Sequence, residues 1–444
     1  MKTRSDIQTS KFQFQYILTW LRKSSFVKNV FVVMSGTAVA QVLGFALTPI
    51  ISRLYSPSDF GVFGSFYAIS AVIAAGTTLQ YTQAIMLPKE KKDAINLFIL
   101  SCLCTVAVGF LCFIFCLLAS TFVNGLMKTE GVWALSLLVA ATVVGGLNQS
   151  CQAWCVRAKA FKHTAASQVI RSLSKNGARI GFGYLKIGAA GLIVSNVLGN
   201  ILASLNLIRV LLPDLLAFRR YIRWDRIKQL AKDYRDFPMY SASQNVINSL
   251  SSGFAVLLLT HFYGIAIAGA YAFGMSILWT PMSLLIGALR QVLFQKAAET
   301  QHHGGSLTPL YMKVTAGLFA LAFFPSVVLF IWAPEIFTWI FGSQWYTAGE
   351  FAKFLILWMM FTFCNLPAVL FAQIIRIQRS VFFYDLVLLA VRVVTLVIGG
   401  LYLNALQTIC LFSLVGAAMN AILIFLVGHA VMKKEGQANL LKLA

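Results

Sequence analysis

The feature that most constrains this chain is a series of long apolar segments, which recurs from residue 29 to residue 432. A bilayer is crossed by about 20 consecutive apolar residues in a helix, and the segments have this length or more. Hydrophobic residues make up 59% of the sequence and charged residues 11%, whereas soluble domains carry roughly 25% charged residues. The sequence therefore predicts an all-α polytopic membrane protein. It excludes a water-soluble, disordered, collagenous or disulfide-stapled chain.

The pattern predicts twelve transmembrane helices. The fifth is the least apolar of them, because it carries three cations. The expected ranges are 29–52, 60–87, 94–123, 131–155, 167–187, 189–212, 237–262, 268–295, 308–333, 348–375, 380–403 and 406–432.

The basic residues predict the orientation. The chain has 36 Lys and Arg against 14 Asp and Glu, for a net charge of +22. If loops alternate from an inner N-terminus, only Arg53, Lys128 and Lys186 fall in outer loops. The positive-inside rule then places both termini in the cytoplasm. Because the cations lie between apolar segments, no nucleic-acid partner is expected.

The longest inner loop, 213–236, divides the helices six and six. It is basic, and we expect it to lie as an amphipathic linker on anionic lipid headgroups. A shift of 208 residues aligns Tyr55 with Tyr263 and Gly61 with Gly269. Because six is even, both halves begin on the same side, so the repeat is parallel about an axis along the membrane normal. Transporters of this plan bind substrate between their halves.

Five segments are therefore expected. They are a cytoplasmic amphipathic N-terminal tail (1–28), a first lobe (29–212), the cytoplasmic linker (213–236), a second lobe (237–432) and a cytoplasmic C-terminal tail (433–444).

The fifth helix carries the sharpest functional signal. Arg171, Lys175 and Arg179 recur every fourth residue, so they form one stripe that spans about 12 Å at about 1.5 Å per residue. Each cation costs roughly 2.5–3.5 kcal/mol at mid-bilayer, which favours a stripe that faces protein or a water-filled cavity and neutralises an anionic substrate. The alternative is a short helix whose cations extend to the inner interface.

Polar residues also recur in the first helix of each half. Gln41 lies in such a stripe in the first helix, and Gln244, Asn245 and Asn248 lie in one in the seventh. They indicate either a wetted cavity wall or hydrogen bonds between helices.

Two further charges lie within the eleventh helix. Arg392, near its middle, is a candidate substrate-binding residue of the cavity, and Asp385, seven residues earlier on the same face, is a candidate site for a coupling H+ or Na+. A water-bridged structural pair is the alternative. The sequence has no Walker A loop, H-E-x-x-H or nucleophile elbow, so we expect no enzyme activity, cofactor or metal.

Four stretches, taken in order, resemble a known family. They are Arg53-Leu-Tyr-Ser-Pro-Ser-Asp-Phe-Gly61, Tyr234-Arg-Asp-Phe-Pro-Met-Tyr240, the segment from Pro281 through Arg290-Gln291 to Glu299, and Phe341-Gly-Ser-Gln-Trp345 with Ala348. On these motifs the chain resembles the Wzx-type oligosaccharide flippases of the multidrug/oligosaccharidyl-lipid/polysaccharide (MOP) exporter superfamily.

The resemblance implies two six-helix lobes that form a V around a central cavity, as in the MATE transporters of that superfamily. It implies that helices one, two, seven and eight line the cavity, with Gln41, Arg53, Gln83, Gln244, Asn245, Asn248, Arg290 and Gln291 as lining candidates. Arg290 departs from the pattern expected of that helix.

The implied cargo is an oligosaccharide repeat unit on undecaprenyl pyrophosphate, moved from the inner to the outer leaflet of the bacterial inner membrane for O-antigen, capsule or exopolysaccharide synthesis. Implied partners are membrane lipids and the polymerase and chain-length proteins of that pathway. The chemistry agrees, because Arg binds pyrophosphate through paired hydrogen bonds, and Gln and Asn suit sugars.

Two other functions stay open. A drug or cation antiporter of the same superfamily predicts acidic cavity residues, and Asp385 alone is available. A membrane-embedded polysaccharide polymerase or ligase would have a large outer loop that carries Arg or His residues. The longest expected outer loop, 334–347, contains neither residue type.

Overall fold

The computed structural model describes residues 25–302, 305–375 and 377–443. The expected N-terminal amphipathic tail falls largely outside them. Helices of the first lobe are α2 (Ser25–Leu54), α3 (Pro57–Gly76), α4 (Tyr81–Ala84), α5 (Lys91–Leu118), α6 (Ser120–Met127), α7 (Trp133–Arg157), α8 (Phe161–Tyr184) and α9 (Ala189–Phe218). The connecting segment holds η1 (Arg219–Tyr221), α10 (Trp224–Asp233) and the π-helix η2 (Phe237–Ala242).

The second lobe is also helical. It consists of α11 (Ser243–Tyr263), α12 (Ile265–His302), α13 (Leu307–Phe341), η3 (Ser343–Trp345), α14 (Tyr346–Cys364), α15 (Leu366–Ile374), α16 (Gln378–Tyr402) and α17 (Ala405–Leu443). Over the described residues, 11 helices are long and apolar enough to cross a membrane, so this is a multi-pass membrane protein. The helix α8, at the expected fifth position, is not among the 11 because its charges lower its hydropathy. The count of twelve spans therefore stays a prediction.

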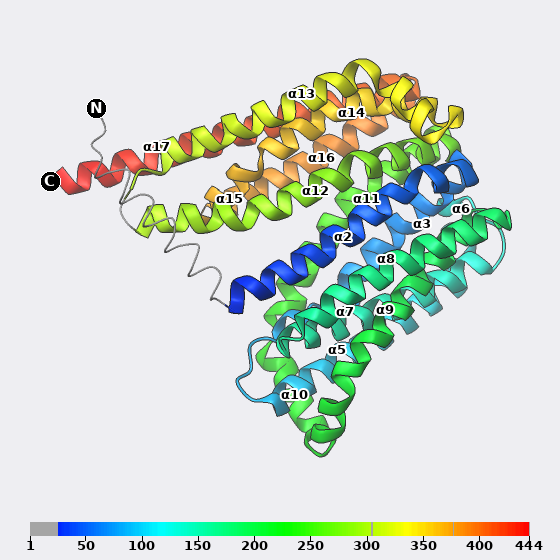
Figure 1. Cartoon of the computed structure of the whole chain (residues 1–444), viewed down its shortest axis with the longest axis vertical. Helices are drawn as coiled ribbons and strands as arrows, with labels where there is room; N and C mark the ends of the chain where they lie inside the picture. Colours follow the sequence, from blue (N-terminus) through cyan, green and yellow to red (C-terminus); the bar gives the residue numbers. More distant parts are fainter. Residues whose placement is uncertain (1–24, 303–304, 376, 444) are drawn as a thin grey trace.

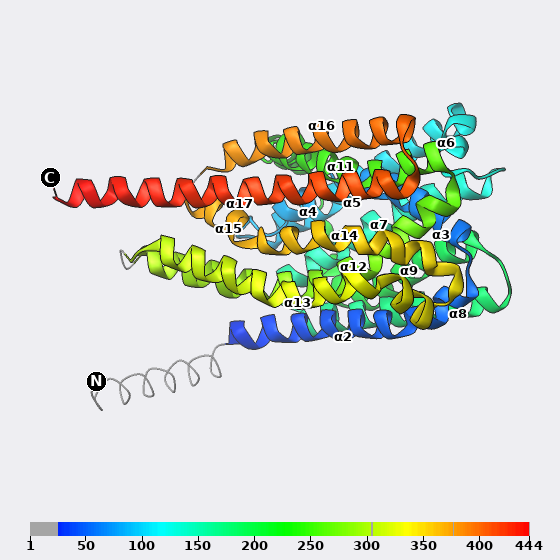
Figure 2. The same cartoon turned by 90° about the horizontal axis from the view of Figure 1, so that it is seen from above.

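The two lobes form a V, as expected (Figure 1). They converge where α2 turns into α3 and where η3 lies, which we call the turn end. They diverge where α10, the start of α2 and the end of α17 lie, which we call the linker end (Figure 1). Figure 2 shows the start of α2 and the end of α17 on the same side of the molecule.

A pair of glycines confirms the parallel repeat. A Cβ on Gly61 would lie 1.9 Å from the backbone oxygen of Ile265, and a Cβ on Gly269 would lie 1.8 Å from that of Pro57. The shift of 208 residues converts each contact into the other, so a pseudo-two-fold axis passes between the starts of α3 and α12. Only glycine allows the two backbones to approach this closely.

The two halves of this symmetric crossing differ. The helix α3 packs along α11, with Gly64 against Val256, Ala68 against Gly253 and Gly76 against Val246. The symmetry-equivalent pair, α12 and α2, makes far fewer contacts. The lobes are thus joined along α3 and α11 and stand apart along α2 and α12.

Side chains close the turn end. Ser52, at the end of α2, donates from Oγ to the backbone oxygen of Phe341 at 3.0 Å. Its own backbone oxygen accepts from Trp345 Nε1 at 2.8 Å and from Gln344 Nε2 at 2.5 Å. The Trp345 ring stacks on Phe273 with centroids 3.9 Å apart, and Phe60 meets it edge-on at 5.1 Å. Two of the motifs that carry the family resemblance therefore meet here.

The linker packs on the first lobe. Ile227 and Leu230, on the apolar face of α10, are buried, and Arg226 forms two hydrogen bonds with the Asp93 carboxylate at 2.7 and 2.8 Å. This hydrogen bonding raises the pKa of Arg226. The linker is amphipathic as expected, but its apolar face is covered by protein, and its basic face remains available to headgroups.

Several helix boundaries differ from the expected ones, among them the ends of α3, α9, α13 and α17. The second span ends at Gly76, and the left-handed residues Leu79 and Gln80 separate it from α4. The sixth continues through Pro213 to Phe218, because Leu215 and Phe218 pack against the buried cluster around Trp154. The last continues to Leu443, and Lys434 Nζ donates to the backbone oxygen of Ile375 at 2.6 Å.

Candidate functional site

The helix α8 places the cationic stripe inside the first lobe. One face of α8 packs on α2, where Ser172 donates to the backbone oxygen of Ala40 at 2.6 Å. The next face packs on α9 at Gly199. A Cβ on Gly199 would lie 3.0 Å from the backbone oxygen of Arg171 and 3.0 Å from the Cβ of Lys175, so the absence of a side chain there makes room for α8. The stripe-bearing part of α8 therefore packs closely on α9, and its three cationic side chains are half-buried.

Arg179 reaches furthest towards the turn end. Its guanidinium lies over the Phe63 ring of α3, 4.9 Å from the centroid, and its backbone oxygen accepts from the Tyr55 hydroxyl at 2.7 Å. Its Nε is buried and lacks a hydrogen-bond partner within the described ranges. Phe63 lies near the start of α3, so this cation does not extend to the linker end. The alternative interpretation, in which the cations extend to the inner interface, required that it should.

The stripe carries charge without a counter-charge. Arg171, Lys175 and Arg179 are all half-buried, and no carboxylate forms an ion pair with any of them in the part of the chain that the structure describes. Buried cations are normally paired. Such an arrangement suits an anion that arrives and leaves.

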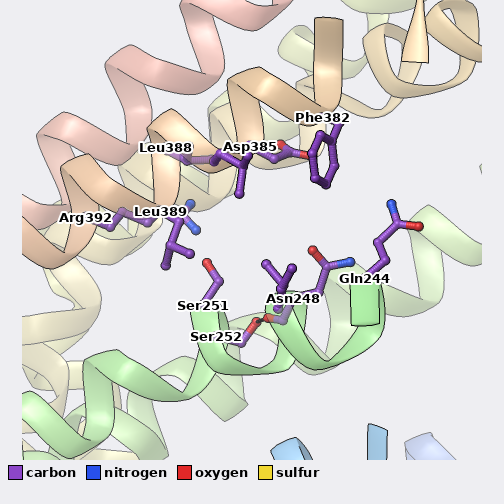
Figure 3. A pocket seen from close by; sticks show the side chains of 11 residues that line it. Gln244, Asn248, Ser251, Ser252, Phe382, Asp385, Leu388, Leu389 and Arg392 are labelled. Carbon is purple, nitrogen blue, oxygen red and sulfur yellow. Dashed lines mark hydrogen bonds between the residues drawn. The ribbon is translucent and has the colours of Figure 1, made fainter. Parts of the chain in front are cut away.

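A second polar site lies in the other lobe, between α11 and α16. It is a pocket of about 250 Å³. Its lining residues are Gln244, Ile247, Asn248, Ser251, Ser252, Phe382, Asp385, Leu386, Leu388, Leu389 and Arg392. Figure 3 shows Gln244 and Asn248 on α11 across from Phe382 and Asp385 on α16, with Arg392 and Leu389 beside Ser251. Four residues predicted from separate helices thus share one pocket.

Arg392 is held from behind by an aromatic ring. Its guanidinium lies over Trp358 of α14, 4.7 Å from the ring centroid, and its Nε is buried without a hydrogen-bond partner among the described residues. Asp385 is exposed. No direct ion pair joins the two within those same ranges, so both charges remain available to a ligand.

The other predicted residues do not join these two groups. Gln41 on α2 is half-buried, and its Oε1 lacks a partner in the described part. Arg53 lies at the turn end and donates to the backbone oxygens of Trp339 and Ile340, each at 3.4 Å. Gln83 lies on α4 beyond the end of α3 and donates to Gln80 Oε1 at 2.8 Å.

Three more predicted residues complete the set. Asn245 is half-buried on α11, beside the pocket but not in its lining. Arg290 is exposed on α12, towards the linker end. Gln291 follows it on the same helix, and its side chain lies outside the described residues.

Sequence reasoning missed the aromatic partners of the cations. Phe63 and Trp358 lie on helices remote in sequence from Arg179 and Arg392, and one aromatic residue among many gives no signal by itself. Ser251 and Phe382 were also missed, although each lies a helical turn from a predicted residue and the i, i+3 spacing could have found them.

Comparisons with solved structures show the fold. A multidrug resistance MATE family transporter of the MOP superfamily, in an inward-facing conformation, matches with a TM-score of 0.66 and 16% identity, over 92% of this chain and 99% of that one. The lipid II flippase MurJ, in an inward closed conformation, matches with a TM-score of 0.69 and 13% identity, over 89% of this chain and 87% of that one. A multidrug resistance MATE family transporter in an outward-facing conformation matches with a TM-score of 0.56 and 18% identity, over 92% of this chain and 95% of that one.

Comparisons of sequence, in contrast, identify one family. No curated protein sequence matches this chain. Residues 50–350, about two thirds of the length, match the family described as polysaccharide biosynthesis protein. That segment includes the stripe on α8, the closure at the turn end and the part of the pocket that α11 supplies. The chain therefore belongs to the polysaccharide biosynthesis protein family, and it has the fold of the MOP superfamily.

Proposed function

We propose that this protein moves an oligosaccharide repeat unit linked to undecaprenyl pyrophosphate from the inner to the outer leaflet of the bacterial inner membrane, for surface polysaccharide synthesis. The observation that carries the proposal is the stripe of three cations inside the first lobe. A pyrophosphate is the anionic part of such a cargo, and guanidinium groups bind it through paired, charge-assisted hydrogen bonds.

The stripe suits transient binding. Arg171 and Arg179 each have a planar donor group, and Lys175 lies between them one turn from each. An anion that binds there offsets the mutual repulsion of three like charges in a low-dielectric interior. A permanent carboxylate partner would instead compete with the cargo, so the lack of a described one favours a binding site over a structural network.

The separation of the lobes supports alternating access. The lobes are closed at the turn end and stand apart at the linker end. With both termini in the cytoplasm, as the basic loops predict, this is an inward-facing state that admits cargo from the inner leaflet. The sparse contact between α2 and α12 leaves a lateral path for a lipid tail, and rocking of one lobe against the other would expose the stripe to the outer side.

Partners and energy follow from the same proposal. Polymerase and chain-length proteins of the pathway would receive the cargo on the outer side. A coupling H+ or Na+ at Asp385, the one carboxylate that lines the second-lobe pocket, stays a prediction that an Asp385→Asn variant tests. A drug or cation antiporter has the same fold, but it predicts acidic cavity residues, and Asp385 is the one acidic residue in the lining of the second-lobe pocket.

The test measures binding of undecaprenyl pyrophosphate to the full chain in lipid nanodiscs. In the triple variant Arg171→Gln, Lys175→Gln, Arg179→Gln we expect affinity to fall at least a hundredfold, since one hydrogen bond to a charged group contributes roughly 1.5–3 kcal/mol. Lys162→Gln is the matched control, because Lys162 is an exposed cation at the start of the same helix. Equal loss in both variants, or unchanged binding in the triple variant, would remove the basis of the proposal.

A further inference from the structure

We infer that the pocket between α11 and α16 binds one sugar residue of the cargo, while the stripe on α8 binds the diphosphate. The inference rests on the proposed function and adds a second, separate subsite to it. The cargo would then contact both lobes at once, with its anionic group in the first lobe and its glycan in the second.

The hydrogen-bonding groups of the pocket suit a sugar. A sugar hydroxyl donates one hydrogen bond and accepts others, so its site must offer both donors and acceptors. The α11 side of the pocket supplies the amides of Gln244 and Asn248, each of which does both. The α16 side supplies an acceptor at Asp385 and a donor at Arg392 (Figure 3).

The charge of the pocket also favours a neutral ligand. Asp385 and Arg392 give the pocket one negative and one positive group, which do not form a direct ion pair in the part of the chain described. The pocket therefore has little net charge, unlike the stripe, and favours a neutral polyhydroxylated ligand over a phosphate. The guanidinium of Arg392 lines the same pocket as Asp385, and its positive charge disfavours a second cation beside it.

The shape of the pocket fits a single sugar ring. Phe382, Leu389 and Ile247 give the pocket apolar surface beside its polar groups, and a pyranose ring has faces of C–H groups that pack on such surface. The pocket has a volume of about 250 Å³, which is room for one ring. The rest of the glycan would extend towards the space between the lobes.

The guanidinium of Arg392 is preorganised to bind a ligand in the pocket. Because Trp358 covers one face of Arg392, its donors are directed along the pocket without a large loss of side-chain freedom on binding. A bare lipid diphosphate would engage only the first lobe, whereas a glycan-bearing one would link the two lobes. Binding at both sites would therefore distinguish loaded from unloaded carrier.

The experiment compares four probes on the full chain in nanodiscs. They are undecaprenyl pyrophosphate alone and the same lipid bearing one glucose, one galactose or one N-acetylglucosamine. For wild type we expect at least one sugar-bearing probe to bind about tenfold more tightly than the bare lipid. In Asn248→Ala and in Asp385→Asn we expect this preference to fall to less than twofold, with bare-lipid affinity unchanged. Ser249→Ala, a neighbour on α11 outside the lining, is the control and should retain the preference.

Bare-lipid affinity also reports folding, because a misfolded variant would lose it. Three outcomes would overturn the inference: a wild type that prefers none of the sugars, a preference that survives both pocket variants, or an Asp385→Asn protein that changes only its dependence on Na+ or pH. The last would make the pocket an ion site. Failure of the proposed function is distinct, since it would appear as unchanged bare-lipid binding in the triple variant of the stripe.

Discussion

Replacing Gly61 and Gly269 by alanine should open the turn end while leaving the helices intact. Each new Cβ would lie at 1.9 or 1.8 Å from a backbone oxygen of the facing lobe, and contacts under 3.0 Å essentially do not occur. The obstructing atoms belong to backbone, so no side chain can rotate away. The lobes must therefore move apart at the axis.

The size of the effect follows from the cost of overpacking, which is typically 1–3 kcal/mol for one site. The two glycines act on the same crossing, so they are not independent and their costs do not simply add. Since 1.4 kcal/mol is a factor of ten, the double variant should lose roughly ten- to a hundredfold in the ratio of turn-end-closed to turn-end-open molecules. Within an isolated helix, replacing glycine by alanine would stabilise the helix by up to about 1 kcal/mol. A loss of turn-end closure would therefore report the contact between the lobes and not helix propensity.

The assay is a distance measurement between spin labels at Lys128 and Tyr402, two exposed positions on opposite lobes, with the eight native cysteines replaced. We expect the double variant to shift the distribution to longer distances. Gly287→Ala on α12 is the matched control, because nothing would lie within 4 Å of a Cβ at that position, and it should behave as wild type. A double variant with the wild-type distribution would refute the reasoning that this crossing holds the turn end closed.

Three further predictions test other parts of the structure. Trp345→Ala removes the stack on Phe273 and the hydrogen bond to Ser52 and should cost about 3–5 kcal/mol of the turn-end closure; unchanged thermal stability and unchanged spin-label distances would contradict this. Asp93→Asn breaks the paired hydrogen bonds to Arg226 and should speed hydrogen exchange in α10 several-fold, whereas Asp233→Asn should not; equal exchange would show that the apolar face alone holds the linker. Phe63→Leu removes the ring under Arg179. Loss of a cation–π contact of about 0.5–2 kcal/mol should change the affinity for undecaprenyl pyrophosphate more than Tyr67→Leu does, since Tyr67 is the more exposed of the two. Identical affinities of the two variants would contradict this.

The membrane architecture was predictable from the amino-acid sequence. Segment length and hydropathy led to the spans, because water is absent from the bilayer core and the backbone must satisfy its own hydrogen bonds there. The parallel repeat followed from the even number of helices and a few aligned residues such as Tyr55 and Tyr263, and the reciprocal contacts of Gly61 and Gly269 confirm it. Boundaries were less predictable. The helix α3 ends at Gly76, and beyond it the Tyr81 hydroxyl donates to the backbone oxygen of Ala231 in the linker, a tertiary contact that hydropathy does not reveal.

The sites were predictable only in part. Helical spacing by itself put Arg171, Lys175 and Arg179 on one face and Gln244 and Asn248 on another, since 3.6 residues make a turn. It could not say what each face meets, because lipid and protein interior are both apolar and select the same residue types. The tertiary structure decided that Arg179 lies over Phe63 and that Asp385 and Arg392 join Gln244 and Asn248 in one pocket. It also decided that these two groups lie in different lobes. The rotation of each helix about its own axis, which packing determines and composition does not, is the physical reason.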